Sequence, residues 1–229
     1  MGFFYWDPTY IIVLPALVFA IWAQAKVNST FQRYLRVFSA SNYTGAQVAR
    51  YLLDANGLHD VRIELTRGTL TDHYDPRTKV LRLSQPVYHS TSLAAIGVAA
   101  HETGHAVQHA HSYIPLTIRN SIFPIANFGS QAAFPLFFIG LIFGIPAFMT
   151  LGIWFFTAAL AFQLVTLPVE FNASRRAMQM LREAGFVTNS EAPKTRQVLS
   201  AAALTYVAAV AVSALQLVRL LVIRNSRER

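Results

Sequence analysis

The chain has 229 residues, of which 54% are hydrophobic and only 13% are charged, with a mean hydropathy of +0.37. Charged residues make up about a quarter of a typical soluble domain, so this composition indicates a membrane protein. The absence of cysteine excludes disulfides and cysteine-ligated zinc. The formal net charge of +8 is typical of Lys- and Arg-rich cytoplasmic segments. We do not expect nucleic-acid binding, because no nucleic-acid motif accompanies the charge.

The first apolar segment, residues 8–25, is uncharged and long enough to cross a bilayer. Asp7, and the lack of a basic residue before the segment, argue against a cleaved signal peptide. Lys26, Arg33 and Arg36 follow it. The positive-inside rule then predicts that the N-terminus lies outside and that residue 26 onward lies in the cytoplasm.

Residues 26–118 are expected to form a soluble α+β region. The apolar spacing predicts a helix over residues 28–39, and Thr44 is expected to cap a second helix that ends at Gly57. Three strands are predicted over residues 61–65, 69–74 and 79–84, the last two joined by a proline-containing turn. One of Ser90, Thr91 and Ser92 is expected to cap the helix that follows.

An uncharged stretch from Asn120 to Val169 predicts a transmembrane hairpin. Gly144–Pro146 divides it into spans over residues 120–143 and 147–168. Pro124 and Pro135 are expected to kink the first span. Since both open ends of a hairpin lie on one side of the membrane, the soluble segment 170–200 is expected to return to the cytoplasm.

A fourth span is predicted over residues 201–222, which are largely uncharged and rich in alanine. This span would leave the basic tail outside, against the positive-inside trend. The alternative is a partly embedded helix in which Arg219 and Arg224 extend towards the membrane surface.

Residues 101–105 form an HExxH motif within an apolar run. On a helix, His101 and His105 share one face and can bind one metal ion. Glu102 then stands beside the metal, where it can hold a water molecule, as a zinc hydrolase requires. The other interpretation is a surface helix with an ion-paired glutamate. The apolar flanks favour a buried helix, in which an unpaired glutamate would be costly.

Glu170 is the leading candidate for the third zinc ligand. A glutamate on a second helix completes sites of the His₂Glu type. Glu170 is the first acidic residue after Glu102, and it follows the hairpin on the side predicted for His101. The alternative is a glutamate that pairs with Arg175 or interacts favourably with the start of a helix.

Other third ligands remain open alternatives. His111 has the metzincin spacing, but Gln108 stands where that motif needs a helix-breaking glycine. Asp72 and Asp75 are further candidates. A site-2-type intramembrane protease would need an aspartate on a distant span, whereas every aspartate of this chain lies at or before position 75.

Three stretches of the sequence, 70–77, 98–106 and 170–177, resemble the YugP-type zinc metallopeptidases, which are small bacterial membrane proteins. The resemblance implies a peptidase with His101, His105 and Glu170 on zinc and Glu102 as the base. The chain also resembles, more distantly, the membrane gluzincins, in which an aspartate four residues after the ligating glutamate supports the ligands. Ser174 occupies that position here, so another partner is expected; the candidates are Asn172, Asp72 and Asp75.

The predicted fold class is an α+β, zincin-like minimal catalytic unit embedded in a mainly α-helical membrane protein with about four transmembrane helices. The whole chain, residues 1–229, is expected to form this single metallopeptidase domain. The expected location is the bacterial inner membrane, with the active site on the cytoplasmic side.

The predicted function is zinc-dependent cleavage of peptides or membrane-proximal proteins. The expected partners are these substrates and the lipid bilayer, with a homo-oligomer or a membrane partner protein as open alternatives. His73 and Tyr74 are the preferred candidates to stabilise the oxyanion, ahead of His109 and Arg175. The strand over residues 69–74 could pair with an extended substrate, although residues 72–75 equally suit a hydrogen-bonded turn.

Two functions of other classes compete with the peptidase. A membrane scaffold or chaperone with a structural zinc site predicts that Glu102→Gln changes nothing. An ion transporter is disfavoured, because the hairpin lacks the ionisable groups that ion pathways usually carry.

Overall fold

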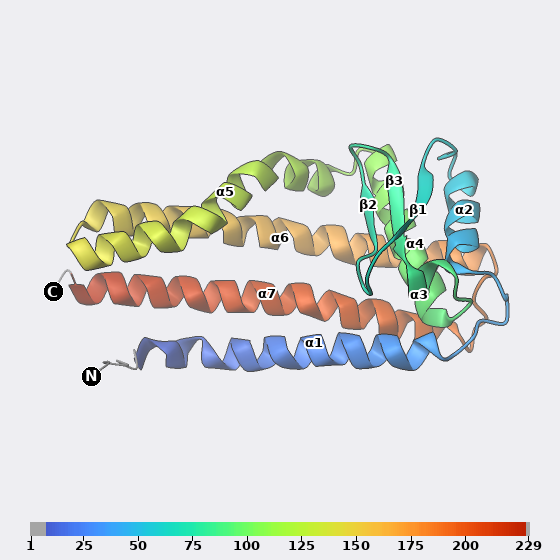
Figure 1. The fold of residues 1–229 in the computed structure, drawn as a ribbon, viewed down its shortest axis with the longest axis horizontal. Coiled ribbons are helices and arrows are strands. Elements are labelled where there is room, and N and C mark those ends of the chain that lie inside the picture. Colours follow the sequence, from blue (N-terminus) through green and yellow to red (C-terminus); the bar gives the residue numbers. More distant parts are fainter. Residues whose placement is uncertain (1–7, 228–229) are drawn as a thin grey trace. The chain divides into compact units, whose positions relative to one another are not determined.

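The computed structural model describes residues 8–227, which fall into two compact units. The sheet unit comprises residues 24–117 and 168–204. The helical unit comprises the described residues of segments 1–23, 118–167 and 205–229. In chain order (Figure 1), the elements are η1 (Pro8–Ile12), α1 (Leu14–Leu35), α2 (Gly45–Ala55), β1 (Arg62–Thr66), β2 (His73–Asp75), β3 (Val80–Ser84), α3 (Gln85–Tyr88), α4 (Leu93–Ala110), α5 (Ile114–Phe143), α6 (Pro146–Glu183) and α7 (Ala192–Arg227).

The sheet has the strand order β1-β3-β2, with β1 parallel and β2 antiparallel to the central strand β3. The three predicted strands are therefore confirmed, but β2 is shorter than the predicted 69–74. Gly68 and Leu70 have φ angles of 98° and 57°. This left-handed backbone cannot continue a strand, so β2 begins only at His73.

Side-chain caps fix the starts of the two helices that pack together in the sheet unit, as predicted. Thr44 and Gln47 form a capping box: the Thr44 hydroxyl accepts from the backbone N–H of Gln47, and the Gln47 side chain accepts from that of Thr44. At the start of α4, the Ser92 hydroxyl accepts from the backbone N–H of Ala95 at 3.2 Å.

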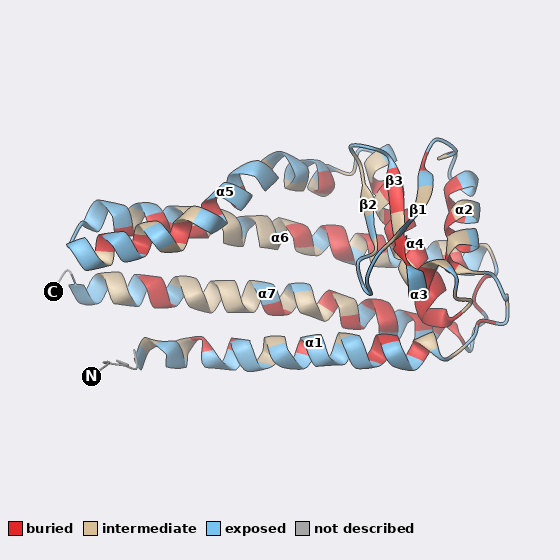
Figure 2. Ribbon diagram, viewed as in Figure 1, coloured by how far each residue is buried: buried red, intermediate tan, exposed pale blue. Residues whose placement is uncertain are grey.

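The core of the sheet unit lies between the sheet and its helices. Figure 2 shows β3 and α4 as largely buried. Leu81 and Leu83 of β3 are fully buried, together with Leu53 of α2 and Ala95 and Ala99 of α4. Each buried leucine contributes about 1.5–3 kcal/mol, so this cluster holds α4 firmly against the sheet.

Three helices of the described chain are long and apolar enough to cross a membrane: α5, α6 and α7. The predicted first span is not among them, because the 3₁₀ helix η1 takes residues 8–12 and only residues 14–25 of the apolar segment belong to α1. Helix α1 continues through the polar residues that follow, including most of the helix predicted over 28–39. A count of four spans is thus not confirmed, and the resemblance of the catalytic unit to the zincin fold stays a prediction.

The helical unit exposes large apolar side chains, as a lipid-facing surface does. Ile125, Phe128, Ile142, Phe143 and Trp154 are each at least 64% exposed. Helix α5 contains both predicted kink prolines and is visibly bent in Figure 1.

Candidate metal centre

Helix α4 brings His101 and His105 together, as their spacing predicts. Their ring centroids lie 4.8 Å apart, with the ring planes at 88°. Both rings are largely buried, with side chains 15% and 13% exposed. The helix around them is rich in alanine and glycine, which lets neighbouring helices approach closely.

Glu170, on the part of α6 that belongs to the sheet unit, faces both histidines. Its Oε2 lies 3.3 Å from His101 Nε2 and 3.5 Å from His105 Nε2. Gly104 makes this approach feasible: a Cβ at this position would lie 2.8 Å from the backbone oxygen of Ala173. Any larger residue would push α4 away from α6.

The donor set suits a zinc ion. One ligand atom each from His101, His105 and Glu170 lies within 4.8 Å of the others. Zinc bonds of about 2.0–2.1 Å in a tetrahedron place neighbouring ligand atoms about 3.3 Å apart. The two measured histidine–glutamate distances lie close to that value, so these residues fit zinc as two imidazoles and one carboxylate.

Gln108 determines which ring nitrogen of His105 carries the proton. Its amide nitrogen donates to the backbone oxygen of Val169 at 2.8 Å, which can only accept. The Gln108 side-chain oxygen therefore faces His105 Nδ1, at 3.0 Å, and accepts a hydrogen bond from its N–H group. Nε2 of neutral His105 is then left with its lone pair towards Glu170, the state that binds a metal.

This fully buried glutamine was not predicted from the sequence, where it only marked the missing metzincin glycine. The available signal was an amide three residues after the second histidine, on the same side of an apolar helix.

Asn172 and Arg176 extend the contacts of Gln108. The side-chain oxygen of Asn172 accepts from Gln108 at 3.0 Å and from Arg176 Nε at 2.8 Å. Asn172 thus supports His105 indirectly, through Gln108. Arg176 holds the Asn172 side chain from the other side.

Ser174 lies against His101, with its hydroxyl 3.2 Å from His101 Nδ1. The sequence suggested that the supporting role of this position would pass to another residue. In the structure, Ser174 itself makes the contact, because one helical turn places it on the same face of α6 as Glu170.

Glu102 is buried beside the two histidines, with 8% of its surface exposed. Within residues 8–227, no hydrogen bond or ion pair reaches its carboxylate. Burial raises the pKa of Glu102 above its ordinary value, against the opposing effect of His101 and His105. Burial lowers the pKa of His105, but the hydrogen bond and charge of Glu170 outweigh it and raise that pKa.

The oxyanion candidates lie in different surroundings. His73 is exposed and its Nδ1 contacts the backbone oxygen of Thr71 at 2.8 Å. Tyr74 is half-buried, and its hydroxyl lies 3.0 Å from His109 Nδ1 on α4. Burial, assisted by Asp60 and Asp75, raises the pKa of Tyr74 to about 12. Arg175 is exposed. The role of each in stabilising an oxyanion stays a prediction.

The alternative third ligands have other contacts. Asp72 accepts from the backbone N–H and the hydroxyl of Ser84 at 2.7 and 3.0 Å. Burial raises the pKa of Asp72, although these hydrogen bonds lower it. Asp75 accepts from the Arg77 N–H and the Thr78 hydroxyl within the turn. His111 is exposed at the C-terminal cap of α4. The group that could hold a metal in the described chain contains none of these three residues.

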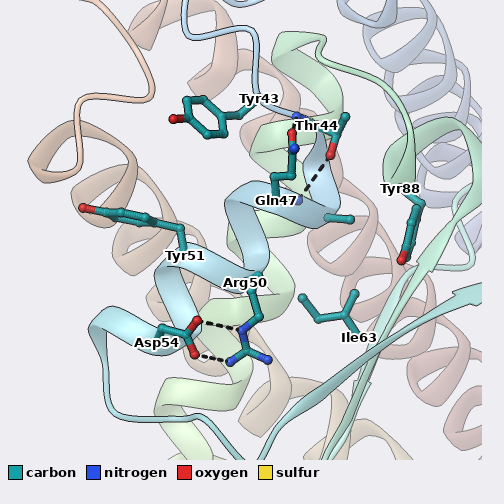
Figure 3. A pocket seen from close by; sticks show the side chains of 9 residues that line it. Tyr43, Thr44, Gln47, Arg50, Tyr51, Asp54, Ile63 and Tyr88 are labelled. Atoms are coloured by element: carbon teal, nitrogen blue, oxygen red, sulfur yellow. Dashed lines mark hydrogen bonds and ion pairs between the residues drawn. The ribbon is translucent and has the colours of Figure 1, made fainter.

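A separate cavity of about 680 Å³ lies beside α2 and shares no residue with the metal centre (Figure 3). Tyr43, Tyr51 and Tyr88 line it. Its basic side chain is already paired: Arg50 contacts Asp54 at 2.7 Å and donates to the backbone oxygens of Leu58 and Val61.

Comparisons with known proteins agree with this geometry. Residues 9–225 match the sequence model of a family described as "Putative neutral zinc metallopeptidase". The chain is 52% identical over 212 residues to the "Putative membrane protease YugP" of Bacillus subtilis (strain 168), covering 93% of this chain and 94% of that protein. No solved structure matches. These two matches cover nearly the whole chain, and they show that it belongs to the family described as "Putative neutral zinc metallopeptidase".

Proposed function

We propose that the protein is a zinc-dependent membrane endopeptidase that cleaves membrane or membrane-proximal polypeptides. The observation that carries this proposal is the Glu102 carboxylate, which lies in a largely buried residue beside three residues that fit zinc and which no hydrogen bond or ion pair of residues 8–227 reaches. Withdrawing a carboxylate from bulk water without a hydrogen bond from the protein is costly. Such a group is retained where it has a chemical task, and in this position the task is to hold a water molecule.

His101, His105 and Glu170 would hold the zinc ion. When bound, zinc supplies Lewis-acid polarisation of a carbonyl and lowers the pKa of a water molecule to about 7. Glu102 accepts a proton from the attacking water and later delivers it to the leaving amine. Gln108 and Ser174 keep the two imidazole rings in the orientation that this chemistry needs.

Stabilisation of the oxyanion is assigned to His73 or Tyr74. A pKa of about 12 keeps the Tyr74 hydroxyl protonated at neutral pH, so it can donate a hydrogen bond. Strand β2, which carries both residues, forms one edge of the sheet. An edge strand has unpaired backbone groups that an extended substrate can use.

A membrane location is supported by the three apolar helices and by the name of the relative. Glu170 directly follows the uncharged stretch that ends at Val169. We therefore place the site near the membrane surface, and the basic residues after residue 25 favour the cytoplasmic face.

The test compares purified wild type with Glu102→Gln for bound zinc and for cleavage of peptides. We expect both proteins to bind one zinc ion and only wild type to cleave. His101→Ala should lose zinc, whereas His111→Ala, the matched control, should keep both zinc and activity. Comparative membrane proteomics of cells carrying either form would identify substrates. Stoichiometric zinc without cleavage of any membrane substrate would leave the structural-zinc scaffold as the better explanation.

A further inference from the structure

A second pocket of the sheet unit, of about 460 Å³, combines three basic side chains with hydroxyl groups and an apolar end. Lys26 of α1, Arg182 of α6 and Arg196 of α7 line it together with Thr30, Ser200 and Leu204. It shares no residue with the metal centre. Binding of a ligand in this pocket is therefore independent of the proposed peptidase activity.

In the part of the chain that the structure describes, the three cations have no anionic partner. Within residues 8–227, no ion pair or side-chain hydrogen bond involves Lys26, Arg182 or Arg196. By contrast, Arg50 in the cavity of Figure 3 is held by Asp54. Like charges repel, so a protein that gathers three of them around one hollow gains from an anion placed there.

The donors suit a phosphate group. Arginine presents a planar fork of N–H groups that matches phosphate oxygens, and lysine supplies a compact positive charge. The hydroxyls of Thr30 and Ser200 offer further hydrogen bonds. No acidic side chain lines the pocket to oppose an anion.

The position of these residues in the sequence indicates where the phosphate comes from. Lys26 is the first charged residue after the apolar segment 8–25, and α7 is a candidate membrane span. Along one face of α7, the lining changes from Arg196 through Ser200 to Leu204, that is, from charged to apolar in the direction of the span. A phospholipid has the same order: a charged phosphate, then an apolar chain.

We propose that this pocket binds the phosphate of an anionic phospholipid head group. Lys and Arg beside a membrane attract anionic lipids, and basic pockets next to spans hold their head groups. The three basic residues contact the phosphate, and the Leu204 end of the pocket contacts the start of an acyl chain.

The test measures lipid retained by the full chain, purified in detergent, by native mass spectrometry with phosphatidylglycerol or phosphatidylcholine. Wild type should retain phosphatidylglycerol preferentially. Replacing Lys26, Arg182 and Arg196 together by Gln should weaken that binding about 100-fold, from roughly fivefold per residue. The control, which replaces Arg36, Arg67 and Arg77 by Gln, has the same net charge and should bind as wild type does.

Two further arms address folding and the source of the phosphate. The variant R182K/R196K keeps all three charges and should bind more phosphatidylglycerol than the triple Gln variant. Millimolar inorganic phosphate should not displace the lipid. Equal retention of both lipids by wild type, an equal loss in the control, or displacement by free phosphate would each overturn the lipid assignment.

Discussion

The orientation of His105 by Gln108 gives the sharpest prediction. Replacing Gln108 by Met keeps a side chain of similar length in a fully buried position, but it removes the oxygen that accepts from His105 Nδ1. It also removes the donor to Val169 and Asn172. The His105 ring then has no group that fixes which nitrogen carries the proton.

The loss should appear chiefly in metal affinity. Removing a partner of a metal-binding histidine typically weakens binding 10- to 100-fold, which corresponds to about 1.4–2.7 kcal/mol. That range agrees with one hydrogen bond to a group that becomes partly charged, about 1.5–3 kcal/mol. Asn172 keeps its contact with Arg176, so the damage should stay local.

The assay is a zinc titration of the purified protein in competition with a chromophoric chelator. The matched control is Gln179→Met, an exposed glutamine of α6 whose side-chain nitrogen donates to Glu183. The control should bind zinc as wild type does. A Gln108→Met protein that melts like wild type and binds zinc with unchanged affinity would refute the role of Gln108 as a positioning residue. An equal loss in both variants would do so as well.

Two further predictions concern the packing around the site and the response to acid. Gly104→Ala should destabilise the fold by about 1–3 kcal/mol and reduce zinc affinity, because the new methyl group meets the backbone oxygen of Ala173. In the control Gly97→Ala, the new methyl group meets the Thr195 side chain. This control should lower the melting temperature less and leave zinc affinity unchanged. Burial opposes ionisation of Glu191, but the N–H groups of Thr188 and Ala40 outweigh this and lower its pKa below 4.5. Ionised Glu191 therefore stabilises the fold above the unfolded-state pKa, and this contribution is lost as the pH falls through the lower folded-state pKa. At pH 7, the free energy of unfolding of wild type should exceed that of Glu191→Gln by about 1 kcal/mol, and the difference should vanish on acidification. A stability difference that persists in strong acid would contradict this reasoning.

Local signals in the sequence predicted where helices begin and which two strands a turn joins. Thr44 and Ser92 cap helices because their hydroxyls accept backbone N–H groups that no helix can satisfy internally. The HExxH spacing predicted that His101 and His105 share one face, because residues four positions apart lie on the same side of a helix. Where a backbone angle departs from the regular values, as at Leu70, the local pattern predicted too long a strand.

The sequence by itself thus determined the apolar helices α5, α6 and α7, the three strands and the two histidines with Glu102 between them, because each depends on residues a few positions apart. The approach of Glu170 and the contacts of Gln108 and Ser174 depend on how closely α4 and α6 pack. That distance is decided by Gly104 against the backbone at Ala173, two positions far apart in the chain. Only the tertiary structure brings such positions together, and so only it reveals the residues that orient the two histidines.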